Sequence, residues 1–454
     1  MKIKELISFQ NHKIAILWFW KEGKSTLFFL LKLWLSNISI LDKNKNIEQI
    51  EWIKYIIWEK YLCNLDEYKI IFKTAWISPY TKELDKYKDK LITQSQLFFD
   101  NYKWKVIWIT WTKWKSTIST LTYEILKKIW YNVKLVGNIG NPVLDEINIL
   151  NNEKYDYIIY ELSSYMLEWM NPKLYIWVLN NIYNCHIEWH KWRENYEKAK
   201  YWIIKNAEYK LINYELNNEI FTNNWAIYFW DSWKYSYKNW LFYNYEQSIL
   251  DDYDIALKWE HNKRNISAVL WIIDIINSND ISKNIEKIKE ILSSFSGLPH
   301  RLENIWTYNW ITFIDDGIAV TPEATIAAIE TYKQNIWTII LWWQDWNYDY
   351  IKLVNILQKY NIENIVLFPD TWEKIFWNLS EYNYENEFIL KWTFNPKILK
   401  TKSMKSAVSF AYKNTSKWKI CLLSNAAPSY NLWSGFIEKW LEYQFEIKNY
   451  LNKK

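Results

Sequence analysis

Short apolar runs alternate along the chain with longer stretches in which apolar residues recur at helical spacing. The runs occupy residues 13–17, 38–41, 70–72, 106–110, 156–160, 176–179, 337–341, 365–368 and 420–423. Continuous apolar runs of this length, bounded by polar residues, are typical of buried parallel strands. Because strands that alternate with helices build parallel sheets, the pattern predicts an α/β fold.

The first apolar run leads directly into a turn and then a helical stretch. Trp18, Trp20 and Gly23 stand in this turn at the spacing of a dinucleotide-binding turn. The second run ends at Asp42, about 20 residues after the turn, where an acidic residue often meets a ribose or a base. A nucleotide-binding turn and a plain strand-to-helix turn without ligand both fit this spacing.

The composition of the chain is unusual in its glycine and tryptophan content. The 454 residues include 34 Trp and only 6 Gly, whereas an ordinary protein is about 7% Gly. The two counts together make about 9% of the chain, close to an ordinary glycine content. We therefore hypothesise that most Trp letters stand for glycine, as they would if TGA codons read as Gly were translated as Trp. The hypothesis predicts Trp wherever turns or phosphate binding require glycine.

The fourth apolar run continues into a segment with phosphate-loop spacing. With Trp read as glycine, residues 108–117 read Gly-Ile-Thr-Gly-Thr-Lys-Gly-Lys-Ser-Thr, at the point where a strand gives way to a helix. Backbone N–H groups crowd around phosphate oxygens in such a loop, and a Cβ at 111 or 114 would block that approach. Lys115 would neutralise phosphate charge, and the hydroxyl of Ser116 would ligate Mg²⁺. The full binding segment is Trp111, Thr112, Lys113, Trp114, Lys115, Ser116 and Thr117.

Two later strands end in candidate metal ligands. The run at 156–160 is followed by Glu161, a carboxylate suited to a metal beside the phosphates. The run at 176–179 is followed by His186 and His190, two of the five histidines in the chain. A lone histidine is more often structural than a ligand, but its place after a strand of the same sheet favours His186 as a site residue.

Charge and cysteine content narrow the class of protein. The net charge of +5 arises from 56 basic and 51 acidic residues, which is too balanced to indicate nucleic-acid binding. The cysteines, Cys63, Cys185 and Cys421, are far apart, so they favour a reducing cytoplasm over a disulfide framework. No apolar stretch is long enough for membrane insertion, and the N-terminus lacks the layout of a signal peptide.

These features together resemble the Mur ligases, ATP-dependent amide-forming enzymes of peptidoglycan precursor synthesis. The resemblance is strongest to the members that add glutamate to UDP-N-acetylmuramoyl-L-alanine, and it covers nearly the whole chain. The matching segments are the N-terminal turn and residues 111–116, 137–142, 161–164, 186–200, 259–265, 297–303, 315–317, 341–345 and 423–430. Ten of the Trp letters fall where the family carries glycine, whereas Trp433 falls where it tends to carry an aromatic residue.

The resemblance implies three α/β domains. Residues 1–102 would form a Rossmann-like N-terminal domain that binds the UDP part of the substrate through Trp18, Trp20 and Asp42. Residues 103–296 would form a central ATPase-type parallel sheet that binds ATP and Mg²⁺. Residues 297–454 would form a Rossmann-like C-terminal domain that brings in glutamate. Pro299 marks a hinge, because Gly and Pro break the preceding helix.

The resemblance also implies roles for individual residues. Lys115, His186 and Lys200 would be catalytic, and the lysine at the position of Lys200 is often carbamylated in the family. Ser116 and Glu161 would hold one Mg²⁺, and His186 and Lys200 a second. Further contacts are implied for the nucleotide (Asn262, Asn265, Arg301, Asp316), the muramoyl substrate (Asn138, His186) and glutamate (Ser424, Tyr430).

The implied reaction starts with phosphorylation of the L-alanyl carboxylate by ATP. The amino group of glutamate then attacks the acyl phosphate, and domain closure excludes water that would hydrolyse this intermediate. The substrates would be UDP-N-acetylmuramoyl-L-alanine and glutamate, and the enzyme is expected to be a cytoplasmic monomer.

Three departures from the family pattern and three alternatives remain. Cys185 replaces an Asp, Ile318 replaces a Lys near the glutamate site, and Asn425 replaces a common Pro. The alternatives are another Mur-type ligase such as a folylpolyglutamate synthase relative, a nucleotide-binding protein without ligase activity, and an aromatic-rich protein that binds sugars or membranes. The last requires Trp clustered on one face, whereas the Trp letters fall at strand ends and turns.

Overall fold

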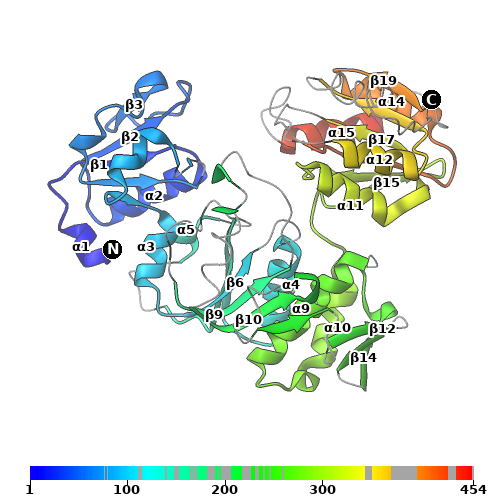
Figure 1. Ribbon diagram of the computed structural model, residues 1–454, viewed down its shortest axis with the longest axis horizontal. Helices are drawn as coiled ribbons and strands as arrows, with labels where there is room; N and C mark the ends of the chain where they lie inside the picture. Colours follow the sequence, from blue (N-terminus) through cyan, green and yellow to red (C-terminus); the bar gives the residue numbers. More distant parts are fainter. Residues whose placement is uncertain are drawn as a thin grey trace. The chain divides into compact units, whose positions relative to one another are not determined.

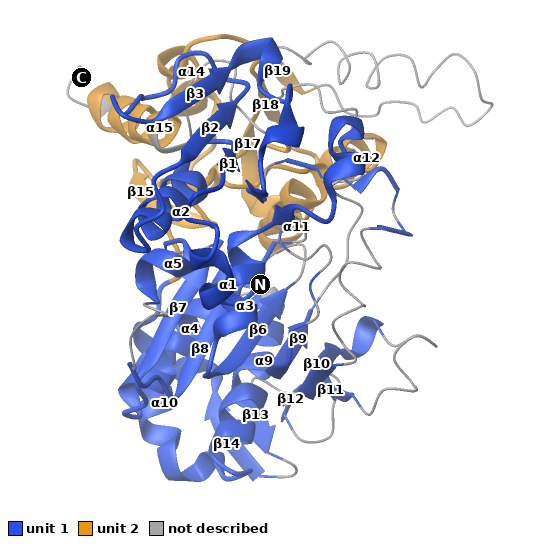
Figure 2. Ribbon diagram, turned by 90° about the vertical axis from the view of Figure 1, so that its left-hand side faces the viewer, with its two compact units in different colours: residues 1–296 blue, residues 297–454 orange. Residues whose placement is uncertain are grey.

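The computed structural model consists of two compact units, residues 1–296 and 297–454 (Figure 2). It describes the chain except residues 76, 79, 111–114, 139–140, 148–152, 164–165, 167–169, 171, 181–189, 193, 196–205, 217–225, 231–234, 239–240, 245–246, 258–259, 343–349, 370–395, 428–435 and 452–454. The three predicted domains, with boundaries near residues 102 and 296, stay predictions.

The first sheet of unit 1 is wholly parallel, in the order β3-β2-β1-β4-β5. Its strands are β1 (Ile14–Leu17), β2 (Ile38–Asp42), β3 (Lys54–Ile57), β4 (Ile70–Lys73) and β5 (Leu91–Ile92). Its helices are α1 (Ile3–Ile7), α2 (Lys21–Lys32) and α3 (Gln94–Asn101). Every residue of β1, β2 and β4 is buried, as expected of apolar runs covered on both faces (Figure 1).

The second sheet of unit 1 is also parallel, in the order β11-β10-β9-β6-β8-β7. Its strands are β6 (Lys105–Thr110), β7 (Val133–Gly137), β8 (Tyr157–Glu161), β9 (Leu174–Leu179), β10 (Ala207–Asn213) and β11 (Ile227–Phe229). The helices of this part are α4 (Lys115–Lys128), α5 (Val143–Glu146), α9 (Glu260–Ile276) and α10 (Ile285–Ser294). Helix α4 packs on β6, β7 and β8, so its first turn is fixed to the end of β6.

A small antiparallel sheet follows between β11 and α9. It consists of β12 (Tyr235–Lys238), β13 (Leu241–Asn244) and β14 (Gln247–Asp251). Strand β12 alternates tyrosine with polar residues, and β13 and β14 carry two or three polar or tyrosine residues each, so none forms a continuous apolar run that the sequence pattern would reveal.

Unit 2 is built on a mixed sheet in the order β15-β16-β20-β17-β18-β19. The strands are β15 (Glu303–Tyr308), β16 (Ile311–Asp316), β17 (Ile336–Leu341), β18 (Asn364–Leu367), β19 (Lys397–Lys400) and β20 (Ile420–Ser424), and only β15 runs antiparallel. The helices are α11 (Pro322–Tyr332), α12 (Ile351–Lys359), α14 (Met404–Asn414) and α15 (Phe436–Leu451). Strand β20 comes last in the sequence but lies between β16 and β17 in the sheet. Ligand sites in α/β sheets are common where the strand order changes in this way.

Candidate active site

The predicted phosphate loop joins the carboxyl end of β6 to the first turn of α4. Residues 111–114 lie outside the described part of the chain, whereas Lys115 begins α4 and Ser116 and Thr117 follow as buried residues. A helix start presents unpaired backbone N–H groups and the positive end of the helix dipole, which favour a phosphate. Strand β6 is central in its sheet, so this end lies beside the ends of β8 and β9.

Glu161 lies next to this loop because its strand pairs with β6. Ile109 and Glu161 are register partners, which leaves the carboxylate one residue from the end of β6. The Glu161 side chain is fully buried. Its Oε1 accepts a hydrogen bond of 2.8 Å from the side-chain amide of Asn138, while its Oε2 has no hydrogen-bond partner among the described residues. A buried carboxylate oxygen without a partner is costly, and a cation beside it would offset that cost.

Gly137 allows Asn138 to reach Glu161. Its φ is +108°, and a Cβ there would stand 2.2 Å from the Glu161 carbonyl oxygen. The backbone N–H of Asn138 donates to that carbonyl at 2.8 Å, in addition to the side-chain bond. The structure therefore brings together two residues that the sequence assigned separately, one to the metal and one to the muramoyl substrate.

The two asparagines predicted at the nucleotide belong to a buried chain of amides. Asn265 Nδ2 lies 3.3 Å from Asn262 Oδ1, and Asn180 Nδ2 donates to Asn265 Oδ1 at 3.1 Å. Asn213 donates to Asn180 Oδ1 at 2.9 Å, and all four side chains are buried. Asn180 and Asn213 were not predicted as site residues; both stand directly at strand ends, which is the signal that would have found them.

The N-terminal turn holds Asp42 in a fixed position. Asp42 Oδ2 accepts the backbone N–H of Phe19 at 2.6 Å, and its Oδ1 accepts that of Asn44 at 2.8 Å. Trp18 has a positive φ in this turn, and Trp20 is the exposed N-cap residue of α2. Asp42 thus orders the turn that the sequence assigned to UDP, and its role toward a substrate stays a prediction.

In unit 2, Ser424 and Asp316 meet at the ends of β20 and β16. Ser424 Oγ donates to Asp316 Oδ2 at 2.9 Å, and Thr325 Oγ1 lies 2.9 Å from the same hydroxyl. Thr325 was not predicted; it lies on α11, which begins shortly after Asp316. The substituted residue Asn425 donates from Nδ2 to the Gly317 carbonyl oxygen at 2.6 Å.

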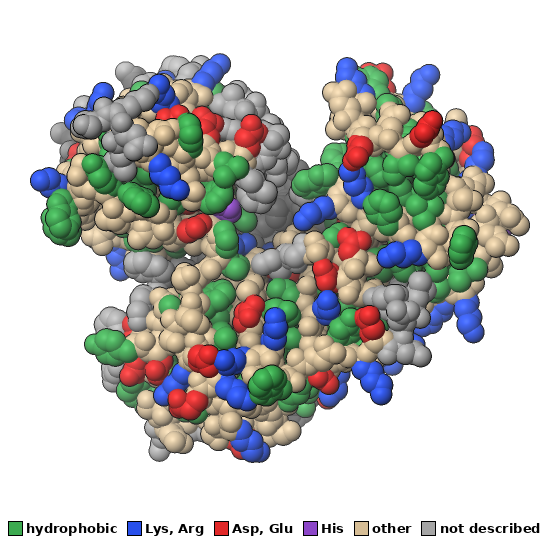
Figure 3. All heavy atoms as spheres, turned by 180° about the vertical axis from the view of Figure 1, so that it is seen from behind, with side chains coloured by type: hydrophobic (Ala, Val, Ile, Leu, Met, Phe, Trp, Pro, Cys, Tyr) green, Lys and Arg blue, Asp and Glu red, His purple; other side chains and the backbone are tan. Residues whose placement is uncertain are grey.

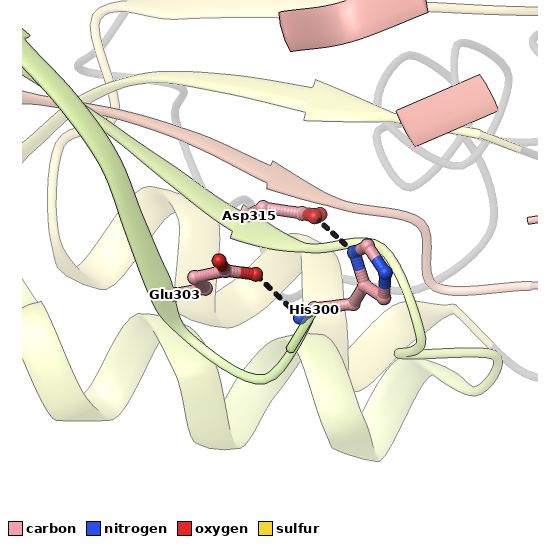
Figure 4. A group of neighbouring side chains, drawn as sticks. All are labelled: His300, Glu303 and Asp315. Atoms are coloured by element: carbon pink, nitrogen blue, oxygen red, sulfur yellow. Dashed lines mark hydrogen bonds and ion pairs between the residues drawn. The ribbon is translucent and has the colours of Figure 1, made fainter. Parts of the chain in front are cut away.

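A second cluster lies beside this pair and centres on Asp315. Its Oδ2 lies 2.7 Å from His300 Nδ1, and its Oδ1 accepts the backbone N–H of Gly317 at 2.7 Å. Glu303 accepts the backbone N–H of His300 at 2.8 Å (Figure 4). These bonds fix the turn that carries Arg301, which directly follows His300.

Lys439, which the sequence did not indicate, is buried against the same loop. Its Nζ donates to the Gly317 carbonyl oxygen at 3.2 Å. On α15 it stands four and eight residues before Tyr443 and Ile447, which are both fully buried, so helical spacing places it on the buried face.

The charge of Lys439 predicts a pH dependence of stability. Burial lowers the pKa of Lys439 to about 8, against the opposing charges of Asp315 and Asp316. Between about pH 8 and 10.5 the unfolded chain keeps this proton while the folded chain loses it, so the free energy of unfolding rises with pH in this window. We expect the unfolding free energy of the wild type, minus that of Lys439→Met, to rise by roughly 3 kcal/mol from pH 8 to 10.5. The expected slope is about 1.4 kcal/mol per pH unit. Urea titrations at a series of pH values measure it, and a flat difference would contradict the prediction.

The remaining predicted residues are not placed. Trp111, Thr112, Lys113 and Trp114 lie outside the described residues, as do His186, Lys200 and Tyr430, together with Cys185. The second metal pair and part of the glutamate site therefore stay predictions.

Comparison with known proteins identifies the family. Residues 109–267 match the family model described as the Mur ligase middle domain. The UDP-N-acetylmuramoylalanine–D-glutamate ligase of Francisella philomiragia is 30% identical over 387 residues, which cover 83% of this chain and 85% of that protein. The chain belongs to the Mur ligase family. The ligase of the same name from Clostridium kluyveri is 28% identical, over 93% of this chain and 94% of that protein.

Solved Mur ligase structures share the fold. UDP-N-acetylmuramate–alanine ligase of Thermotoga maritima matches with a TM-score of 0.58 and 15% identity, over 97% of this chain and 100% of that one. MurF of Acinetobacter baumannii matches with a TM-score of 0.59 and 14% identity, over 96% and 92% of the two chains. The predicted α/β class and the family resemblance are confirmed, and as a Mur ligase the chain is an ATP-dependent ligase. Among the helices of the described residues, none combines the length and apolar character needed to cross a bilayer.

Proposed function

We propose that this Mur ligase joins D-glutamate to UDP-N-acetylmuramoyl-L-alanine through an amide bond, with ATP and Mg²⁺, in the cytoplasm. The relatives named UDP-N-acetylmuramoylalanine–D-glutamate ligase match this chain over most of their own length. The single structural observation that carries the proposal is the buried Glu161 carboxylate, one oxygen of which has no partner among the described residues, one strand away from the helix start that Lys115 opens.

Glu161 and Ser116 are the residues that would hold Mg²⁺. Both lie at the carboxyl edge of the central sheet, and both offer the oxygen ligands that this ion prefers. The ion would neutralise charge on the phosphates of the nucleotide. Asn138 holds the Glu161 carboxylate in one orientation through Oε1, which leaves Oε2 for the ion.

The residues of the chain contribute positioning and charge neutralisation. Lys115 and the N–H groups at the start of α4 would bind the transferred phosphate, a role that needs little covalent participation by the protein. Asn262 and Asn265, fixed by the buried amide chain, would contact the nucleotide. In unit 2, Asp316 and Arg301 would contact ATP, and Ser424 would contact glutamate.

A substrate panel tests this function. The purified enzyme is incubated with ATP, Mg²⁺ and UDP-N-acetylmuramoyl-L-alanine, and ADP release is measured with D-glutamate, L-glutamate and other amino acids. We expect ADP and the amide product to form in equal amounts with D-glutamate. Product formation with a folate acceptor alone would move the chain to another branch of the family, and nucleotide binding without amide product would overturn the ligase assignment.

A further inference from the structure

We infer that glycine, and not tryptophan, occupies at least seven of the Trp positions in the protein that its own cell makes. The positions are Trp18, Trp34, Trp58, Trp130, Trp230, Trp310 and Trp418. All seven have a φ between +61° and +85°, in the left-handed region. Side chains with a Cβ rarely adopt this backbone conformation, whereas glycine adopts it freely.

The remaining left-handed residues show how selective this placement is. Of the 17 described non-glycine residues with positive φ, seven are Trp and four are Asn. Asn is enriched in this region because its short side chain bonds locally, but a bulky indole has no such compensation. Trp therefore occupies the left-handed backbone positions that glycine ordinarily occupies.

Two helix ends carry the inference furthest. After α2, the N–H of Trp34 donates to Leu31 O at 2.9 Å and that of Leu35 to Leu30 O at 3.1 Å. This pair of bonds is the Schellman motif, whose left-handed C′ residue, here Trp34, is usually glycine.

The end of α4 repeats the motif. Trp130 donates to Lys127 O at 3.1 Å and Tyr131 to Leu126 O at 3.0 Å, so Trp130 takes the same C′ place. The end of α12 has the same two bonds with Asn361 at C′, and Asn is the usual second choice there. The chain thus follows the capping rule at all three ends once Trp is read as glycine.

The hairpin between β15 and β16 gives an independent indication. Tyr308 and Ile311 are register partners, so the loop consists of Asn309 and Trp310, and their φ values are +48° and +67°. A two-residue loop with both φ values positive is a type I′ turn, for which Asn-Gly is the strongest sequence signal. The pair printed as Asn-Trp here therefore reads as Asn-Gly.

The exposure and burial of the Trp side chains favour glycine at these positions, as the backbone angles do. Nine of the 16 exposed large hydrophobic side chains among the described residues are Trp, and Trp34 and Trp130 are 90% and 85% exposed. Figure 3 shows hydrophobic side chains of all types at several places on one face. In the sheet interior, Trp108 and Trp177 are register partners, and the indole N–H of each is buried without an acceptor in the described structure. A glycine at either place would leave no such donor.

Peptide mass spectrometry of the protein from its own cell tests the inference directly. Tryptic peptides 33–43 and 129–134 contain one Trp position each, residues 34 and 130. We expect both peptides at the mass that glycine gives, with TGA codons at both positions. Masses that match tryptophan would overturn the inference, whatever the enzymatic activity of the protein.

A stability comparison tests the structural reasoning by itself. Starting from a synthetic gene that encodes Trp throughout, Trp34→Gly and Trp130→Gly should raise the Tm by about 2–4 °C each. The matched control is Trp52→Gly with Trp306→Gly, since both side chains are exposed and neither has a positive φ. Equal shifts in the two pairs would overturn the backbone argument. If the all-Trp chain fails to fold, restoration of cooperative unfolding by glycine at all seven positions, and not by the control pair, is the expected result.

Discussion

Replacing Lys115 by alanine is expected to lower ligase turnover by at least about 10³-fold, or ~4 kcal/mol of transition-state stabilisation. Lys115 opens α4 at the end of the predicted phosphate loop, where a positive charge neutralises the phosphate that leaves ATP. The loss should appear mainly in kcat, because the charge matters most as the phosphoryl group transfers. Steady-state release of ADP, together with the amount of amide product, measures it.

A lysine at the other end of the same helix serves as the control. Lys127 is exposed in the last turn of α4, so Lys127→Ala removes one charge from the same element far along its length from the loop. It should leave kcat and KM within about twofold of the wild type, since exposed surface substitutions have small effects. Activity of Lys115→Ala close to that of Lys127→Ala would show that residues 111–117 do not form the ATP site.

Glu161→Ala is expected to lower kcat by about 10²–10⁴-fold, which corresponds to the several kcal/mol that a catalytic metal supplies. Glu161→Gln keeps the shape and the bond to Asn138 but loses the charge, so it should raise the Mg²⁺ concentration needed for half-maximal activity. Titration of Mg²⁺ at saturating ATP separates a metal role from a purely structural one.

The matched control for this second experiment is Glu146→Gln. Glu146 is a carboxylate of the same part of unit 1, but its partners are Lys134 at 3.2 Å and Asn141 at 2.6 Å. Its replacement should leave the Mg²⁺ requirement unchanged. A Glu161→Gln enzyme with an unaltered Mg²⁺ requirement would remove Glu161 from the metal site, and thermal unfolding of both variants would show whether either loss reflects misfolding.

Nine of the 20 described strands coincide with predicted runs, because burial on both faces leaves a continuous apolar run. The runs at 38–41 and 420–423 differ from β2 and β20 only by the final polar residue of each strand, Asp42 and Ser424. Strand β19 was not predicted, since at 397–400 only two apolar residues stand between two lysines, at the edge of the sheet. Edge strands are covered less completely, so their sequences carry a weaker apolar signal.

Candidate site residues could be named from the sequence where one segment carries the chemical pattern, and not where distant segments meet. Lys115 and Ser116 follow from a contiguous pattern, and Glu161 from its place at a strand end. By contrast, Lys439 lies 122 residues after the carbonyl oxygen of Gly317 to which it donates. Only the packing of α15 on the sheet decides that contact, because spacing along a chain does not encode long-range neighbours.

The sequence by itself determined the α/β class, the family and the order of the nucleotide-type turns, because buried strands, phosphate loops and turns each have a local pattern. The tertiary structure decided that Asn138 orients Glu161 and that the other oxygen of this buried carboxylate has no partner in the described part of the chain. It also decided which Trp positions have a left-handed backbone, as at Trp34 and Trp130. The physical reason is the same in both cases. Hydrogen-bond partners and φ angles depend on how helices and strands pack and where they end, and the order of residues along the chain does not specify either of them directly.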